Sequence, residues 1–353
     1  MDRLEHHSHF SDLAIRDYRE HIAVEMNYTA LVSGFRKHFG DRLQHPEILV
    51  SYDQTDTDQA FRAMAVRSGH SLAAKNAMAQ ASAIAALSDR ISGYSAIRRI
   101  HEMVQNMDEE IGPFIDLLEE LKGKAFCRER LTVSVISGSE PSLERLLGAL
   151  PLGSAVPEDA EYVTDLPRHK GCVIPAKTSF SAKGILLDRK VDPCVRVAAN
   201  IASLGYLWNM IRVQGGAYGA GLSAGSRGGV TFYSYRDPDP IRSLEVSRGV
   251  PDFLRAFCAS DESLDGYIIS TLSEDEPLRT PREEDAAGDR MWLSGTTEQD
   301  LLEERDKVLH TTKEKILENL FVFERFAEDG NYSVVGMEEA LMDQDGLTIC
   351  PLL

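Results

Sequence analysis

The chain has 353 residues, 43 % of them apolar, and carries 56 acidic against 38 basic side chains, for a formal net charge of −18. This length predicts about two globular domains, and the apolar share is enough to give each a core. The negative charge repels a phosphate backbone and argues against nucleic acid as a partner. The acidic excess either simply keeps the protein in solution or attracts basic peptides.

The sequence contains no run of about 18 apolar residues, and its charged, histidine-rich N-terminus is unlike a signal peptide. We therefore expect a soluble, cytoplasmic protein with no membrane partner. The cysteines are odd in number and never spaced C-x-x-C, which argues against a disulfide framework and a thiolate metal site. We expect reduced, structural thiols at Cys127, Cys172, Cys194, Cys258 and Cys350.

The first part of the chain is predicted to be helical. Residues 1–52 are polar and cannot be assigned to a domain, whereas residues 53–129 are rich in alanine, leucine and glutamate. Segments such as "SLAAKNAMAQASAIAALSDRISG" are separated by glycines that suit helix ends. This block is predicted to form about three helices.

A second domain, residues 130–353, is predicted to mix strands with helices. "RLTVSVISGS" alternates β-branched and polar residues as a strand does, and "CVIPAKTSFSAKGIL" predicts one or two more. "PCVRVAANIASLGYLWNMIR" has helical spacing of apolar residues, and "GAYGAGLSAGSRGGVTFYSYR" predicts a hairpin that turns at residues 225–229. In "SYRDP", Arg236 and Asp237 predict a local ion pair.

The rest of this domain begins with a well-marked helix, in which Asp239 is the predicted N-cap and Pro240 the first helical residue. A helix from Leu264 to Ser273 is followed by an acidic loop, Glu274 to Asp285, which is either solvated or lines a chamber for basic peptides. Charged helices are predicted at 298–328, and "NYSVVGM" is the last predicted strand. Without a regular β-α-β alternation, the fold class is α+β.

The stretch "RVQGGAYGAG" holds the candidate site residues. Arg212 and Tyr218 can both donate hydrogen bonds to an oxygen that gains negative charge, and Gly215 and Gly216 let another backbone come close. Read structurally, Arg212 caps its helix, Tyr218 fills a strand position and the glycines form turns. A phosphate loop is excluded because the stretch follows a helix and lacks both G-x-G-x-x-G and a Walker lysine.

Several ordered motifs resemble one family. "GYLWNMIRVQGGAYGAG", "GVTFYSYRDPDP" and "DFLRAF", with the upstream "SGHSLAA" and "SGYSAIRRI", resemble the C-terminal half of presequence protease-like enzymes. These enzymes are a branch of the pitrilysin/insulinase zinc metallopeptidases, the inverzincins. The resemblance extends over about residues 60–335 and is strongest at 205–240.

The resemblance implies a clam-shell of four related α+β domains around a chamber for unfolded peptides. Zinc is held by the first half through H-x-x-E-H and a later glutamate, and the second half contributes an arginine and a tyrosine, here Arg212 and Tyr218. It also implies a domain like that of the mitochondrial processing peptidase at 130–353, preceded at 53–129 by the helical remnant of a truncated third domain. Gly215 and Gly216 then become candidates for substrate binding at a sheet edge.

No zinc motif is present, since the chain contains neither H-x-x-E-H nor H-E-x-x-H. The nearest match is "DYREH" at 17–21, where aspartate stands in place of the first histidine; His21 and Glu25 also lie one helical turn apart. The histidine-rich N-terminus is another weak candidate. We therefore expect this chain to bind no metal, and we expect zinc on a partner.

The function predicted is the non-zinc half of a peptide-degrading metallopeptidase, inactive alone and completed by a zinc-bearing half or subunit. The alternative is a catalytically inactive peptide-binding or structural relic of the same fold. The retained Arg212 and Tyr218 favour the first, and the short segment before "SGHSLAA" favours the second.

Overall fold

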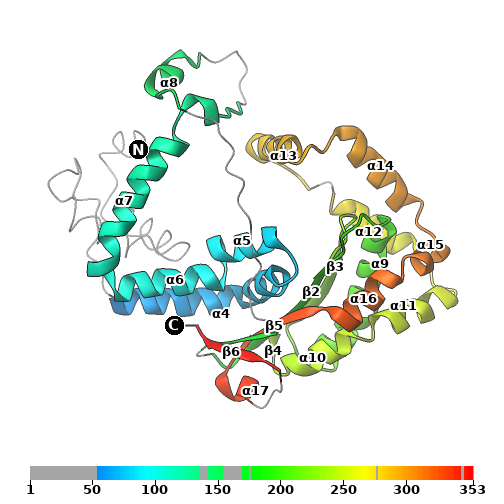
Figure 1. Cartoon of the computed structure of the whole chain (residues 1–353). Helices are drawn as coiled ribbons and strands as arrows, with labels where there is room; N and C mark the ends of the chain where they lie inside the picture. Colours follow the sequence, from blue (N-terminus) through cyan, green and yellow to red (C-terminus); the bar gives the residue numbers. More distant parts are fainter. Residues whose placement is uncertain are drawn as a thin grey trace.

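The computed structural model describes residues 54–135, 142–153, 169–174, 176–275, 277–342 and 346–352. It is an α+β fold in which one six-stranded sheet has helices on both faces (Figure 1). The predicted fold class is confirmed.

The sheet has the order β3-β4-β2-β5-β1-β6. Strands β3, β4, β2 and β5 pair antiparallel, whereas β1 pairs parallel with both β5 and β6. The bounds are β1 Lys170–Val173, β2 Ser179–Leu186, β3 Gly219–Ala224, β4 Gly229–Asp237, β5 Asn331–Gly336 and β6 Thr348–Pro351. The predicted hairpin at 225–229 is confirmed as the β3–β4 connection, where Gly228 has φ +89°.

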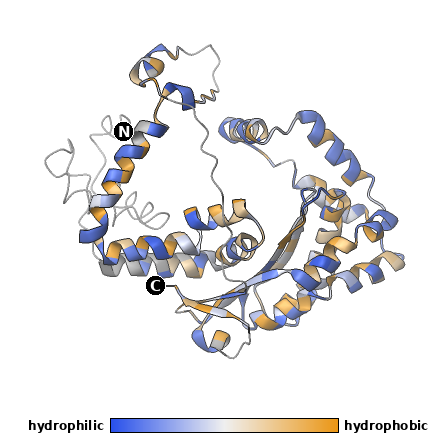
Figure 2. Cartoon of the chain, viewed as in Figure 1, coloured by the Kyte–Doolittle hydropathy of each residue, from blue (hydrophilic) through white to orange (hydrophobic). Residues whose placement is uncertain are grey.

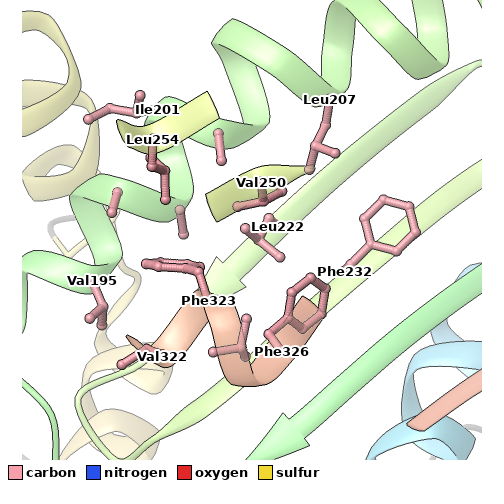
Figure 3. Packing of buried hydrophobic residues seen from close by; sticks show 14 of the residues in the cluster. Val195, Ile201, Leu207, Leu222, Phe232, Val250, Leu254, Val322, Phe323 and Phe326 are labelled. Atoms are coloured by element: carbon pink, nitrogen blue, oxygen red, sulfur yellow. The ribbon is translucent and has the colours of Figure 1, made fainter. Parts of the chain in front are cut away.

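One face of the sheet carries the larger core. Val230 and Phe232 alternate inward along β4, and they meet apolar side chains of the covering helices (Figure 3). Phe323 and Phe326 enter the same core and are fully buried. The covering helices are α9 Cys194–Ile201, η3 Ala202–Val213, α10 Pro240–Ser247, α11 Val250–Ala259 and α16 Phe321–Asp329.

The other face is covered by the first described helix, α4 (Gln54–Ala79), which packs on β2, β5 and β4. The helix departs from helical geometry at Ser68, and a Cβ at Gly69 would lie 2.3 Å from the Phe180 ring, so glycine permits this close approach. The smaller core joins Leu72 and Tyr94 to Phe180 of the sheet. The first helix of the predicted 53–129 block thus shares a core with the predicted second domain.

The rest of the helical block consists of α5 Ala83–Ser92, α6 Tyr94–Gln105 and α7 Met107–Ala125, so residues 54–125 hold four helices rather than three. The predicted strand at "RLTVSVISGS" is not formed at 131–135, because no strand pairs with this segment in the described part of the chain. A short η2 Arg128–Arg130 and α8 Glu144–Ala149 flank the segment.

Of the remaining helices, α13 and α14 are largely hydrophilic, as Figure 2 shows for α14, whereas α12 is more apolar and buries Ile268. The predicted acidic loop is shorter than expected, because α13 begins at Pro281 with Glu283 and Glu284 in its first turn. Thr280 caps this helix in a capping box with Glu283, which explains the helical start. The bounds are α12 Asp265–Ser273, α13 Pro281–Ser294, α14 Glu298–Leu309, α15 Lys313–Glu318 and α17 Glu338–Met342.

Local sequence signals account for several other features. The N-cap at Asp239 and the first-turn Pro240 of α10 are confirmed.

All five cysteines are free, and burial raises the pKa of the Cys172 thiol to about 12. No described helix combines the length and the apolar character needed to cross a bilayer.

Candidate functional site

The candidate site begins at the end of an unusual helix. From Ala202 to Val213 the backbone is a π-helix, continuous with α9, and its wider hydrogen bonding continues to Gln214, whose N–H donates to the carbonyl of Asn209 at 3.0 Å. Helices of this type are rare and frequently occur at functional sites. Arg212 lies in the last turn of η3 and is half-buried.

Two glycines turn the chain from η3 toward β3. Gly216 has φ +79°, a conformation that suits glycine, and its N–H donates to the Arg212 carbonyl at 3.0 Å. A Cβ at Gly215 would lie 2.5 Å from the Ile211 carbonyl oxygen, so this position also requires glycine. The turn accounts for both glycines, and their contact with a peptide stays a prediction.

The Arg212 side chain is held by two aromatic rings. Its guanidinium carbon lies 4.1 Å from the Trp208 ring centroid and 5.4 Å from that of Tyr218. Such contacts contribute about 0.5–2 kcal/mol each and leave the N–H donors of the fork unused. Within the described residues the guanidinium donates to no helix carbonyl, so it is oriented by the rings rather than by capping.

Tyr218 presents its ring to solvent from a fixed backbone. Its N–H donates to the carbonyl of Tyr235 at 3.0 Å, immediately before the first residue of β3. The ring contacts Tyr235 edge-on at 5.7 Å between centroids, yet the residue is 63 % exposed. The structure therefore brings Tyr218 and Arg212 together on one accessible surface.

An aromatic cluster lies behind Tyr218 and was not predicted from the sequence. Tyr235 contacts His70 of α4 edge-on at 4.9 Å, and His70 also lies 5.9 Å from Tyr233. Burial lowers the pKa of His70, and its Nδ1 has no hydrogen-bond partner within the described residues. Of the aromatic residues that surround Arg212 and Tyr218, Trp208 has a sequence signal, which is its i, i+4 spacing from Arg212 on a helix. His70 has none, because it reaches the cluster through tertiary packing.

The ion pair expected between Arg236 and Asp237 is not formed. The Asp237 carboxylate is buried and accepts from the N–H of Asp239 at 3.0 Å. Arg236 lies instead over the Tyr235 ring at 5.5 Å, and its φ of +48° turns its side chain away from that of Asp237. Arg236 is exposed whereas Asp237 is buried, and the register of β4 against β2 shifts at this point, so the two side chains do not meet.

The edge strand β3 is partly covered by the π-helix. The Ser203 hydroxyl donates to the Leu222 carbonyl at 3.0 Å and accepts from the Leu222 N–H at 2.8 Å. Both edge-facing backbone groups of Leu222 are therefore satisfied by a side chain.

The described residues do not fit a zinc ion. No three histidine, cysteine, aspartate or glutamate side chains among them are grouped so that they could hold a metal. The weak candidates of the sequence, His21 with Glu25 and the N-terminal histidines, lie outside the described residues. At the described site, Arg212 thus offers a positive charge and hydrogen-bond donors, and Tyr218 offers a hydroxyl donor.

Comparison with known proteins shows which family part of this chain resembles. Residues 170–338 match the family described as "PreP C-terminal domain". The chain is 27 % identical to presequence protease 1, chloroplastic/mitochondrial, of Arabidopsis thaliana, over 69 % of this chain and 24 % of that protein. It is 26 % identical to protein HypA of Clostridium perfringens, over 79 % of this chain and 29 % of that protein.

The chain therefore spans about a quarter of the length of the curated relatives that it matches. A solved structure of a peptidase M16 inactive domain from Pseudomonas fluorescens aligns with 12 % identity and a TM-score of 0.38, covering 55 % of this chain and 48 % of that one. The matched region, residues 170–338, contains Arg212, Tyr218 and strands β1 to β5 of the sheet. Residues 170–338 therefore belong to the PreP C-terminal domain family, and together with the presequence protease relatives this supports a C-terminal half of the pitrilysin/insulinase superfamily.

Proposed function

We propose that this chain is the non-zinc half of a peptide-degrading metallopeptidase, and that it completes the active site of a zinc-bearing half with Arg212 and Tyr218. The observation that carries the proposal is their placement on one accessible surface, with the guanidinium 5.4 Å from the Tyr218 ring. Two hydrogen-bond donors fixed side by side suit a substrate oxygen that becomes negative.

The two side chains have different roles in the proposed reaction. As the scissile carbonyl becomes tetrahedral, its oxygen gains negative charge, and the Tyr218 hydroxyl donates a hydrogen bond to it. A donor placed in this way commonly contributes about 3–4 kcal/mol to the transition state. Arg212, held by Trp208 and Tyr218, anchors a substrate carbonyl as a fixed cation in both the bound and the transition state.

The substrate proposed is an unfolded peptide in a chamber between the two halves. Gly215 and Gly216 are proposed to let the peptide backbone approach the start of β3, where main-chain hydrogen bonds tolerate many sequences. We retain the assignment of 53–129 to the helical part of a third domain and of 130–353 to the last domain as part of this proposal. The chain alone is proposed to be inactive.

The proposal is tested by adding this chain to a zinc-bearing half encoded in the same genome and identified by H-x-x-E-H. Tyr218→Phe should lower kcat on the order of a hundredfold with little change in peptide affinity, because its hydroxyl acts mainly on the oxyanion. Arg212→Ala should reduce both kcat and affinity. Assembly and thermal melting of each variant are measured alongside turnover.

The alternative, a structural or peptide-binding relic, gives a different result. A Tyr218→Phe complex that assembles, melts like the wild type and turns over at full rate removes the catalytic role. Hydrolysis of peptides by this chain without a partner contradicts the proposal that a zinc-bearing half is required for catalysis.

A further inference from the structure

A polar cavity lies away from Arg212 and Tyr218, between α10, α16 and the start of β5. Its volume is about 700 Å³, and its lining is mostly charged or polar. Lys183 of β2, Arg248 beyond the end of α10, and Arg325 of α16 supply the positive charges. Neither the cavity nor its lining takes part in the proposed peptidase function.

Lys183 is the most enclosed charged group of this cavity, with only 3 % of its surface exposed. Its Nζ donates to the Ala327 carbonyl at 2.7 Å and lies 5.0 Å from the centroid of the Phe326 ring. An ammonium group has three donors, so this carbonyl leaves two of them available. Burial, followed by the charge of Arg248, lowers the pKa of Lys183 to about 8.

The backbone is shaped around this lysine. A Cβ at Gly330 would lie 2.3 Å from Cε of Lys183 and 2.8 Å from the Phe326 carbonyl oxygen. Any other residue at 330 would displace the lysine or the end of α16. The position of the buried ammonium therefore depends on two residues, Lys183 itself and Gly330.

Two of the acidic side chains that line the cavity pair with arginines. Glu245 pairs with Arg248 at 3.2 Å, and Asp329 pairs with Arg325 at 2.8 Å. Within the described residues no carboxylate lies within ion-pair distance of Lys183, and its Nζ donates to one neutral carbonyl there. Glu245 and Asp329 act on the ammonium only from beyond that distance, so its burial remains unfavourable and an anion entering the cavity relieves part of that cost.

We propose that this cavity binds a small oxyanion, a phosphate or carboxylate group, through the Lys183 ammonium, with Arg248 as a second cation at the rim. Glu328, Asp329 and Glu245 stand on the exposed side and disfavour large polyanions, so a single anionic group on a small molecule fits best. The stacked rings of His169 and Tyr332, 4.0 Å apart, provide a flat wall for the rest of such a molecule.

The proposal is tested with the full chain at pH 7 and low salt, titrating inorganic phosphate and acetate separately by calorimetry against a sodium chloride control. We expect saturable binding of at least one of them, to one site per chain. Lys183→Met should weaken that binding at least tenfold, and Arg248→Gln should weaken it less. Lys190→Met, which removes an exposed lysine elsewhere, is the matched control and should bind like the wild type.

A second measurement needs no variant. NMR titration of the Lys183 side chain should show its pKa rising when the bound anion is added, and anion affinity should fall as the pH rises past about 8. Other groups that face the lysine are Glu245, Arg248, Arg325, Glu328, Asp329, His169 and Tyr332. Absence of saturable binding by both anions, equal binding by Lys183→Met, or a Lys183 pKa unmoved by either anion overturns the proposal.

Discussion

Lys183→Met is expected to stabilise the protein at neutral pH, although it removes a hydrogen bond. The pKa of Lys183 falls from 10.5 to about 8 on folding, chiefly because the ammonium is buried. At about 1.4 kcal/mol for each pH unit, the charged lysine costs the folded state about 3 kcal/mol below pH 8. Loss of its hydrogen bond to Ala327 and its contact with Phe326 offsets about 1–2 kcal/mol, so a net gain of about 1–2 kcal/mol is expected.

The pH dependence of the difference in unfolding free energy between Lys183→Met and the wild type gives a sharper test than the size of that difference at one pH. Because the pKa of Lys183 is lower in the folded state, the unfolded chain binds more protons between pH 8 and 10.5, and this contribution to stability increases with pH. The thiols have the opposite effect, since burial raises the pKa of Cys172 and Cys194, but they are present in both proteins and cancel in the difference.

Urea unfolding at intervals from pH 7 to 9.5 measures that difference, with Lys190→Met as the control. The advantage of Lys183→Met should be constant up to about pH 8 and then shrink by about 1.4 kcal/mol per pH unit. A difference that is independent of pH, or one that grows above pH 8, refutes the reasoning.

Three further predictions concern stability. Arg196→Ala should lower the free energy of unfolding by about 1–3 kcal/mol in urea, because it breaks a mostly buried bidentate pair with Asp275 at 2.6 and 3.0 Å, and Arg196→Lys should fall in between. Because burial lowers the pKa of His70, the wild type should lose stability as the pH falls below 6.5, and His70→Phe should lose less. An equal fall in melting temperature for both proteins between pH 7 and 5 would contradict this. Gly215→Ala should lower the melting temperature at a cost of about 1–3 kcal/mol, whereas Gly219→Ala, with open space at its Cβ, should not; equal effects would remove the steric argument.

Most of the sheet and its covering helices were predictable because their signals are local. Asp239 and Pro240 mark the start of α10, and glycines mark the turn between β3 and β4. The strand expected at 131–135 shows the limit of such signals, because β-branched alternation forms a strand only when another strand pairs with it. Strand β6 was missed for the converse reason: "TICP" is short and is defined by its parallel pairing with β1.

The candidate site was predictable only in part. Arg212 and Tyr218 were identified from a motif, and the structure brings their side chains together. The sequence does not mark His70 as part of the site, because nothing in "SGHS" indicates that α4 packs on the sheet beside Tyr235. Lys183 lies in a strand of ordinary composition, and its burial follows from the helices that pack over it, which no local pattern describes.

The two hydrogen bonds between the Ser203 hydroxyl and the Leu222 backbone affect how the edge of this sheet can pair with a strand of another chain. An uncovered edge strand is a template for any extended segment, including the same strand of a second copy, and this is a common route to aggregation. Here a foreign strand that ran the length of β3 would first have to displace the Ser203 hydroxyl from both backbone groups of Leu222. Pairing of a second copy along the whole of β3 is thereby hindered at Leu222, so the serine discourages edge-to-edge self-assembly.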